Sequence, residues 1–467
     1  MSKFRMIFPI LIAAIAVNSC AAGPKPMSFA EHTLDKAPKN IIVLVADGWS
    51  YNCVEAAGYF QHGEKGTQPY ERDFTLFPMS TFSLNGQGYD PELAWSDYEY
   101  LKKGAADSAA TATTMSTGVK TTNGAIGVDK DKAPLEHAVQ VAEKTGKATG
   151  VVTSVQMSHA TPAAFVAHVK GRGAYADIAK EMLLESGCEV IMGAGHPWYD
   201  NDGKLVLTKD ANGVETTPNS YRFVGDEALW RECVAGAAGG DCDGDGQPDA
   251  WKLIQTREEF QQLANGDTPK RVLGVPQVAD ALQVSRTSVD GVPEDDAAFQ
   301  TPLLTTVPTL PEMALAALNV LDNDPDGFYL MIEGGAVDWA NHANVAGRMI
   351  EEMIGYGETV QAVSDWVEKN SSWDETLVIV TGDHECGYLL GPGSKPDLKP
   401  IVNNGKGVMP GMEYHYKSHT NQLIPCYVRG AGVELFTKAA TGKDPVRGAY
   451  IDNTDVGLIT KRLLAAR

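Results

Sequence analysis

The side chains best suited to chemistry fall into short segments that lie far apart in this 467-residue chain. Asp107 and Ser108 stand directly before AATATTMSTG, a run of small residues and threonines that predicts a helix from about Ala109 onward. A serine at a helix N-terminus faces free N–H groups and the positive end of the helix dipole, which suits a nucleophile attacking an anion. Asp and Ser are also preferred N-cap residues, so a plain cap is the simpler interpretation of this segment alone.

Three segments in the C-terminal half, VDWANH, GDHECG and YHYKSHTN, combine imidazoles with carboxylates. In VDWANH, Asp338 and His342 are four positions apart and would share one face of a helical turn. Together the segments supply enough nitrogen and oxygen ligands for two divalent ions of the zinc type, and an all-oxygen site would suit magnesium. The other candidate ligands in these segments are Asp383, His384, His415 and His419.

Paired zinc ions would explain a serine nucleophile that has no neighbouring base. Two such ions about 3.5–4 Å apart can stabilise both the entering and the leaving oxygen of a displacement at phosphorus. A metal also lowers the pKa of a serine hydroxyl, so Ser108 would need no histidine to activate it.

Apolar, β-branched runs alternate with helical segments, which predicts an α/β domain with a mostly parallel central sheet. Polar side chains follow three of these runs: Asp47 follows IIVLVA, Glu333 follows FYLMI and Asp383 follows TLVIVTG. In open α/β sheets, ligands bind outside the carboxyl ends of the strands, so these side chains mark the expected site. Helix then strand is expected at 135–155, 181–195, 311–334 and 348–382.

The segment 196–300 is rich in Gly, Pro, Asp and Thr, and we expect a long insertion over or beside the sheet. Within it, DCDGDGQPD places oxygen ligands at alternate positions around Gly246, as a calcium loop requires. An EF-hand loop would have glutamate where Lys252 stands, so a solvated acidic turn is the alternative. The candidate calcium (Ca2+) ligands are Asp241, Asp243, Asp245 and Asp249.

The N-terminus has the pattern of a secretory signal, with basic residues before an apolar run at 6–17. That run is shorter than the roughly 20 residues that a membrane-spanning helix needs. It ends at VNSC, which resembles a bacterial lipoprotein cleavage box; an ordinary signal peptide cut nearby is the alternative. We therefore expect a lipoprotein-like signal at 1–19, a tether at 20–38 beginning with a lipidated Cys20, and a catalytic domain at 39–467 in the periplasm or anchored to the outer membrane.

The chain has 39 basic and 60 acidic residues and a formal net charge of −21. No Lys/Arg-rich run is visible, so we expect no nucleic-acid binding. An anionic substrate would need local cations that invert the field at the site. Seven cysteines fit an exported protein in which disulfides persist. Cys233 and Cys242 bracket a glycine-rich loop and are the expected pair.

Residues 107–129, DSAATATTMSTGVKTTNGAIGVD, closely resemble the nucleophile segment of the alkaline phosphatases. The other motifs of that family, VADGW, HATPAAFVAHVKGR, IEGGAVDWANHAN, TGDHE and SHTN, follow the family's order between residues 45 and 421. The resemblance implies a three-layer αβα sandwich that hydrolyses small phosphate monoesters through a phosphoserine. It also implies two zinc ions (Zn2+) and one magnesium ion (Mg2+), an exported role in phosphate scavenging, and a homodimer.

The same resemblance assigns roles to individual residues. Ser108 would be the nucleophile, and Arg172 would hold two phosphate oxygens through its planar guanidinium. His419 is preferred to His415 because HTN resembles the family's final ligand motif. One zinc would bind Asp338, His342 and His419, the other would bind Asp47, Asp383 and His384, and magnesium would bind Asp47, Thr161 and Glu333.

Three positions vary within the family pattern. His159 and Trp339 stand where some members have Asp and Lys, a combination that resembles certain marine bacterial enzymes. His159 would then contact the phosphate through water or coordinate the third metal, which puts strict magnesium selectivity in doubt. Cys386 stands where some members have a histidine that supports a zinc ligand.

Two other enzyme classes and one non-enzymatic function compete with this interpretation. A sulfatase needs a C/S-x-P-x-R setting, whereas AATA follows Ser108. A phosphodiesterase would need room for a second substituent, which sequence does not measure. A calcium-binding surface lipoprotein would use the acidic loop but would leave the ordered ligand set unexplained.

Overall fold

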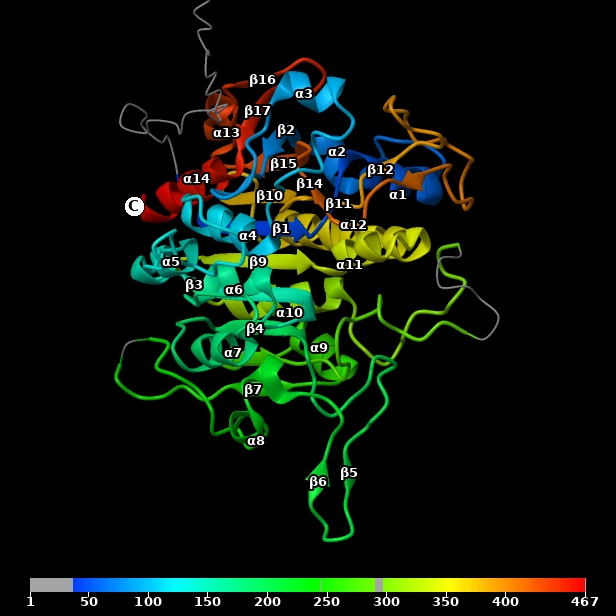
Figure 1. Cartoon of the computed structure of the whole chain (residues 1–467). Coiled ribbons are helices and arrows are strands. Elements are labelled where there is room, and N and C mark those ends of the chain that lie inside the picture. The colour runs from blue at the N-terminus through cyan, green and yellow to red at the C-terminus, as the bar shows by residue number, and fades with distance from the viewer. Residues whose placement is uncertain (1–36, 244, 290–296, 467) are drawn as a thin grey trace, which may run out of the picture.

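A central sheet of eleven strands runs through the protein, with helices on both faces (Figure 1). The computed structural model describes residues 37–243, 245–289 and 297–466. Across the sheet the strands are β16 (Gly442–Asp444), β17 (Gly448–Asp452), β2 (Thr75–Ser80), β15 (Ile424–Gly430), β10 (Thr376–Gly382), β1 (Asn40–Ala46), β9 (Phe328–Gly334), β3 (Ala148–Gln156), β4 (Val190–Ala194), β8 (Val272–Gly274) and β7 (Lys252–Ile254).

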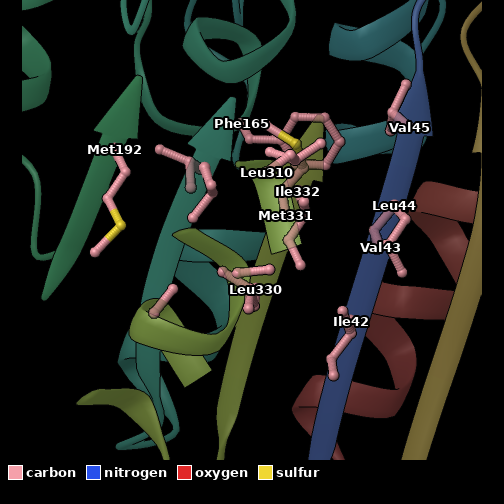
Figure 2. Packing of buried hydrophobic residues seen from close by; sticks show 14 of the residues in the cluster. Ile42, Val43, Leu44, Val45, Phe165, Met192, Leu310, Leu330, Met331 and Ile332 are labelled. Atoms are coloured by element: carbon pink, nitrogen blue, oxygen red, sulfur yellow. The ribbon is translucent and has the colours of Figure 1, made fainter. Parts of the chain in front are cut away.

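Seven neighbouring strands, from β10 to β7, are parallel, and β1 lies between β9 and β10. β15 runs antiparallel to β10 and to β2. Every residue of β1, β9 and β10 is buried, because their apolar runs face helices on both sides. Figure 2 shows Val43 and Leu44 of β1 and Leu330 and Ile332 of β9 in this core.

Two layers of helices complete the expected three-layer αβα sandwich (Figure 1). One face carries α4 (Ser108–Thr117), α5 (Ala138–Lys144), α6 (Ala160–Val166), α7 (Tyr175–Leu184), α13 (Val433–Ala439) and α14 (Asn453–Ala465). The other carries α1 (Tyr51–His62), α2 (Pro69–Asp73), α9 (Arg257–Leu263), α10 (Leu310–Leu321) and α12 (Ala346–Asn370). Each helix–strand pair expected from the sequence is present.

Several short helices and three two-stranded sheets lie outside the central sheet and its two main helix layers. α3 (Pro91–Ser96) packs against β16, α8 (Glu227–Val234) packs against the 3-10 helix η2 (Tyr221–Val224) and β7, and α11 (Ala336–Ala343) follows β9. The two-stranded sheets are β11 (Glu385–Cys386) with β14 (His419–Thr420), β12 (Leu389–Leu390) with β13 (Glu413–Tyr414), and β5 (Thr208–Lys209) with β6 (Glu215–Thr216).

From its composition, the segment 196–300 was expected to lie over or beside the sheet. Part of it instead belongs to the sheet itself. Its strands β8 and β7 extend the parallel sheet beyond β4, while its β5–β6 hairpin projects from the sheet's lower end in Figure 1. The expected Cys233–Cys242 disulfide is absent from this structure, where all six cysteines among the described residues are free thiols. The Cys242 Sγ instead donates to Asp249 Oδ2 at 3.0 Å.

The expected signal at 1–19, the lipidated Cys20 and nearly all of the tether lie outside the described residues. Within the part of the chain that is described, no helix combines the length and the apolarity that a membrane crossing requires.

Candidate active site

The carboxyl ends of adjacent parallel strands bring distant acidic residues to one edge of the sheet. Asp47 follows β1, Glu333 lies near the end of β9, and Asp383 follows β10. The register pairs Ala46 with both Gly334 and Gly382, so the three strands end at the same level. The three carboxylates are fully buried there.

Ser108 lies at this edge, in the first turn of α4. Asp107 is the N-cap, and its Oδ1 accepts from the Ala110 N–H at 3.0 Å, which leaves the Ser108 hydroxyl free for another role. The Ser108 Oγ lies 3.2 Å from His384 Nε2. His384 Nε2 in turn lies 3.1 Å from Asp383 Oδ2 and 3.5 Å from an Asp47 carboxylate oxygen.

A second group of ligand atoms adjoins the first. His419 Nε2 lies 3.3 Å from one oxygen of Asp338, and His342 Nε2 lies 3.4 Å from the other. Asp338 belongs to both groups, since one of its oxygens also lies within 4.8 Å of ligand atoms of Asp47 and His384. The structure therefore brings together all six residues expected to bind zinc.

The histidine rings of the second group are oriented by backbone carbonyls. His419 Nδ1 donates to the Ala106 carbonyl and His342 Nδ1 donates to the Lys417 carbonyl, both at 2.8 Å. In a neutral ring this fixes the tautomer and turns the Nε2 lone pair toward the site, as metal-bound histidines require. The two Nε2 atoms lie only 3.0 Å apart, an arrangement that a shared cation would satisfy.

The neighbouring His415 does not join this group. Its Nε2 lies 3.8 Å from the exposed Glu413 carboxylate, and its ring packs edge-on against Tyr98 at 6.0 Å. The structure thus supports the choice of His419 over His415 as the candidate ligand.

A third set of oxygens lies beside Asp47. Glu333 accepts a hydrogen bond from Thr153, which the sequence did not single out. The other Glu333 oxygen, the Thr161 hydroxyl and both Asp47 oxygens are buried and have no hydrogen-bond partner among the described residues. Buried oxygens without a donor are costly, and a hard cation such as magnesium would satisfy them.

Without bound cations, the buried carboxylates of this site repel one another. Burial, followed by repulsion from Asp383, raises the pKa of Asp47 well above its usual range. Burial also raises the pKa of Asp383 to about 6 and that of Glu333 to about 8, with neighbouring carboxylates adding to both shifts. Divalent cations would remove this repulsion, so the donor set fits the metals that the sequence predicted.

Arg172 and His159 lie beside this cluster. The Arg172 NH1 donates to Asp107 Oδ2 at 3.0 Å, and its backbone N–H donates to the Gly124 carbonyl, so the N-cap residue of α4 also holds the arginine. Burial, together with the nearby Arg172 charge, lowers the pKa of His159 to about 3. Trp339 meets His159 edge-on, with ring centroids 5.7 Å apart.

Cys386 lies among the candidate metal ligands, although the sequence did not predict it as a ligand. Its buried Sγ lies within 4.8 Å of ligand atoms of Asp338, His342 and His419. Cys386 reaches this position because β11 pairs with β14, which places it opposite His419. Its place three residues after Asp383 was visible in the sequence, but this pairing was not.

Three of the four candidate calcium ligands converge. Asp241, Asp243 and Asp249 each offer an oxygen within 4.8 Å of the others, and Asp245 does not belong to this group. The Lys270 Nζ lies 2.6 Å from both Asp243 and Asp249, so a lysine ammonium supplies positive charge to two of them.

The sheet edge thus carries a serine at a helix N-terminus, an arginine and a cluster of carboxylates and imidazoles, a donor set that fits a metal-assisted hydrolase on an α/β scaffold. Residues 38–429 match the alkaline phosphatase family model, so the chain belongs to the alkaline phosphatase family. It is therefore a phosphoric monoester hydrolase.

Individual alkaline phosphatases are similar to this chain over most of their lengths. Alkaline phosphatase H of Pseudomonas aeruginosa is 30% identical over 448 residues, which cover 92% of this chain and 86% of that protein. Alkaline phosphatase of Escherichia coli is 28% identical, covering 86% and 82%. The solved structure of the enzyme from the Antarctic bacterium TAB5 has the same fold, with a TM-score of 0.61, 22% identity, and coverage of 92% of this chain and 99% of that one.

Proposed function

We propose that this chain hydrolyses phosphate monoesters through a phosphoserine on Ser108, at a site that holds two zinc ions and one magnesium ion. One observation carries the proposal: the Ser108 Oγ, at the N-terminus of α4, lies 3.2 Å from an imidazole nitrogen of the buried ligand cluster. A hydroxyl in that position serves no capping role, because Asp107 supplies the cap.

The ligand groups suggest where each ion would bind. Asp338, His342 and His419 would hold one zinc, while Asp47, Asp383 and His384 would hold the other. The oxygens of Asp47, Thr161 and Glu333 would hold magnesium. When bound, these ions supply Lewis-acid stabilisation of the charge on the entering and leaving oxygens.

The chain's own residues then perform the displacement. The Ser108 hydroxyl loses its proton and its Oγ attacks phosphorus, forming the Oγ–P bond as the P–O bond to the alcohol breaks, and the departing alcohol oxygen gains one proton in exchange. Arg172 holds two phosphate oxygens through its planar fork, and Asp107 orients the guanidinium. The free N–H groups of α4 favour the added negative charge. Water then breaks the Oγ–P bond, releasing inorganic phosphate and the free serine.

His159 is proposed to contact the phosphate through water or to bind the metal of the third site, with Trp339 packed against it. A histidine-to-aspartate variant of the TAB5 enzyme has Mg bound in a site called M3. Replacing His159 by Asp and measuring bound magnesium tests the assignment.

The decisive experiment replaces Ser108 by Ala and measures turnover of p-nitrophenyl phosphate together with zinc and magnesium content. Turnover is expected to fall by several orders of magnitude while the metals remain bound. Ser116→Ala is the matched control, because Ser116 is buried in the same helix but donates to the Ala164 carbonyl instead. Near-normal turnover by Ser108→Ala would overturn the nucleophile assignment.

Acid-quenched wild-type enzyme should also carry phosphate on Ser108, which peptide mass spectrometry detects. Assaying the diester analogue and an aryl sulfate in the same buffer separates this activity from the phosphodiesterase and sulfatase alternatives.

We also propose that the protein is exported, anchored through a lipid on Cys20, acts on small phosphate monoesters to scavenge phosphate, and works as a homodimer. The signal-like N-terminus supports export, and family membership supports the dimer. Sedimentation of the purified protein tests the dimer.

A further inference from the structure

A row of aromatic rings leads from the phosphate-binding residues to the segment 196–300. Tyr175 begins α7 three residues after Arg172, and its ring lies parallel to that of His159, with centroids 6.3 Å apart. Phe223 of η2 meets Tyr175 edge-on at 4.9 Å. The Arg222 guanidinium lies over both rings, 5.1 Å from Tyr175 and 4.6 Å from Phe223. We call Tyr175, Phe223 and Arg222 the η2 shelf.

Arg222 is exposed, and no described carboxylate lies within 4.0 Å of its side-chain nitrogens. Arg231, on the next helix, instead pairs with Glu227 at 2.8 Å and with Glu215 at 3.0 Å. An arginine held on two rings but without an acidic partner keeps its donors available for an anion. This is notable in a chain with a net charge of −21, whose long-range field repels anions.

The backbone on either side of Arg172 borders open space, since a Cβ atom added at Gly171 or Gly173 would meet no atom within 4 Å. Arg222 and Phe223 also line a cavity of about 300 Å³. The two carboxylates that line this cavity accept hydrogen bonds from other groups of the protein. Asp200 accepts from backbone N–H groups, and Asp280 accepts from the Gln156 and Asn201 amides.

We infer that the η2 shelf is the subsite for the leaving alcohol and that it favours phosphate monoesters whose alcohol carries a second negative charge. An alcohol attached to a phosphate on Arg172 would lie beside the ring of Tyr175, and its anionic group would reach Arg222. Tyr175 and Phe223 provide apolar contact for the organic part of the alcohol. The inference rests on the phosphomonoesterase activity and names the substrate class of that same site.

The test compares two substrates of equal size, 3-carboxyphenyl phosphate and 3-carbamoylphenyl phosphate, which differ by one charge. The measured quantity is the ratio of their kcat/KM values in each variant. Because both substrates report on the same enzyme sample, a general loss of folding or metal cancels in the ratio. Wild type is expected to favour the carboxylate, and this preference should weaken at high ionic strength because salt screens an exposed charge.

Arg222→Gln should lower the ratio by about two- to fivefold, the range expected for one exposed charge contact. Arg222→Lys should retain part of the preference, and Arg231→Gln, which removes the same charge from a paired arginine, should leave the ratio unchanged. Phe223→Leu should reduce kcat/KM for both aryl esters relative to ethyl phosphate. An unchanged ratio in Arg222→Gln, with both substrates still hydrolysed, would overturn the inference; absence of hydrolysis in wild type would instead overturn the proposed function.

Discussion

Glu143, at the end of α5, is expected to cost the protein stability at alkaline pH. Its carboxyl is largely buried, and burial raises its pKa from 4.5 to about 7, although a hydrogen bond from Thr149 and the charge of Arg271 oppose the shift. Because the folded pKa lies above the unfolded one, the stabilising contribution is complete below about pH 4.5 and is lost as the pH rises through about 7.

The size of the effect follows from the two pKa values. At about 1.36 kcal/mol per pKa unit, the shift from 4.5 to about 7 corresponds to about 3.4 kcal/mol in total. Less than about 1 kcal/mol of this is already lost below about pH 5, so ionising Glu143 should remove about 2.5 kcal/mol of stability between about pH 5 and pH 9. Glu143→Gln cannot ionise and escapes this loss. The difference in unfolding free energy, variant minus wild type, should therefore rise by about 2.5 kcal/mol over that interval.

Urea unfolding at a series of pH values, in constant excess zinc and magnesium, measures this difference. Loss of metal at low pH affects both proteins equally and cancels. Glu136→Gln is the control, since a hydrogen bond from Lys144 lowers the pKa of this more exposed carboxyl and keeps it ionised over the interval. A variant-minus-wild-type difference that stays constant from about pH 5 to pH 9 would refute the reasoning.

Three further predictions concern the metals and the N-terminus. His419→Ala should lose about one zinc ion per chain and nearly all activity, whereas His415→Ala should keep both ions; metal analysis showing the reverse would contradict the ligand assignment. Calcium added after chelation and zinc/magnesium restoration should raise the melting temperature of wild type by relieving carboxylate repulsion, and should raise it much less in the Asp243→Asn/Asp245→Asn variant; an unmoved wild-type value favours the solvated turn. Mass spectrometry of membrane-fraction protein should find a lipid on Cys20 as the first residue, and a free N-terminus elsewhere would count against the anchor.

Features that depend on neighbouring residues were predicted well. The helix beginning at Ser108 follows from Asp107 as its cap, and β1, β9 and β10 follow from unbroken apolar runs. β7 and β8 were missed because each has only three residues, too few for a periodic signal. The Cys233–Cys242 pair was wrong because flanking a loop does not bring two thiols together.

The residues of the η2 shelf were not foreseen either. Arg222 and Phe223 lie in a segment without strong helix or strand periodicity, and nothing near them in the sequence links them to Arg172. Their position beside Tyr175 results from the packing of η2 against α7.

The sequence by itself determined which donors are present and where each lies along the chain: carboxylates at strand ends, a serine at a helix start, and imidazoles in motifs recognised by their order. Only the tertiary structure decided which of them meet. The pairing of β1 with β9 and β10 brings Asp47, Glu333 and Asp383 to one edge, and the pairing of β11 with β14 places Cys386 opposite His419. The physical reason is that local order depends on neighbouring residues, whereas strand pairing depends on burying apolar surfaces from distant parts of the chain.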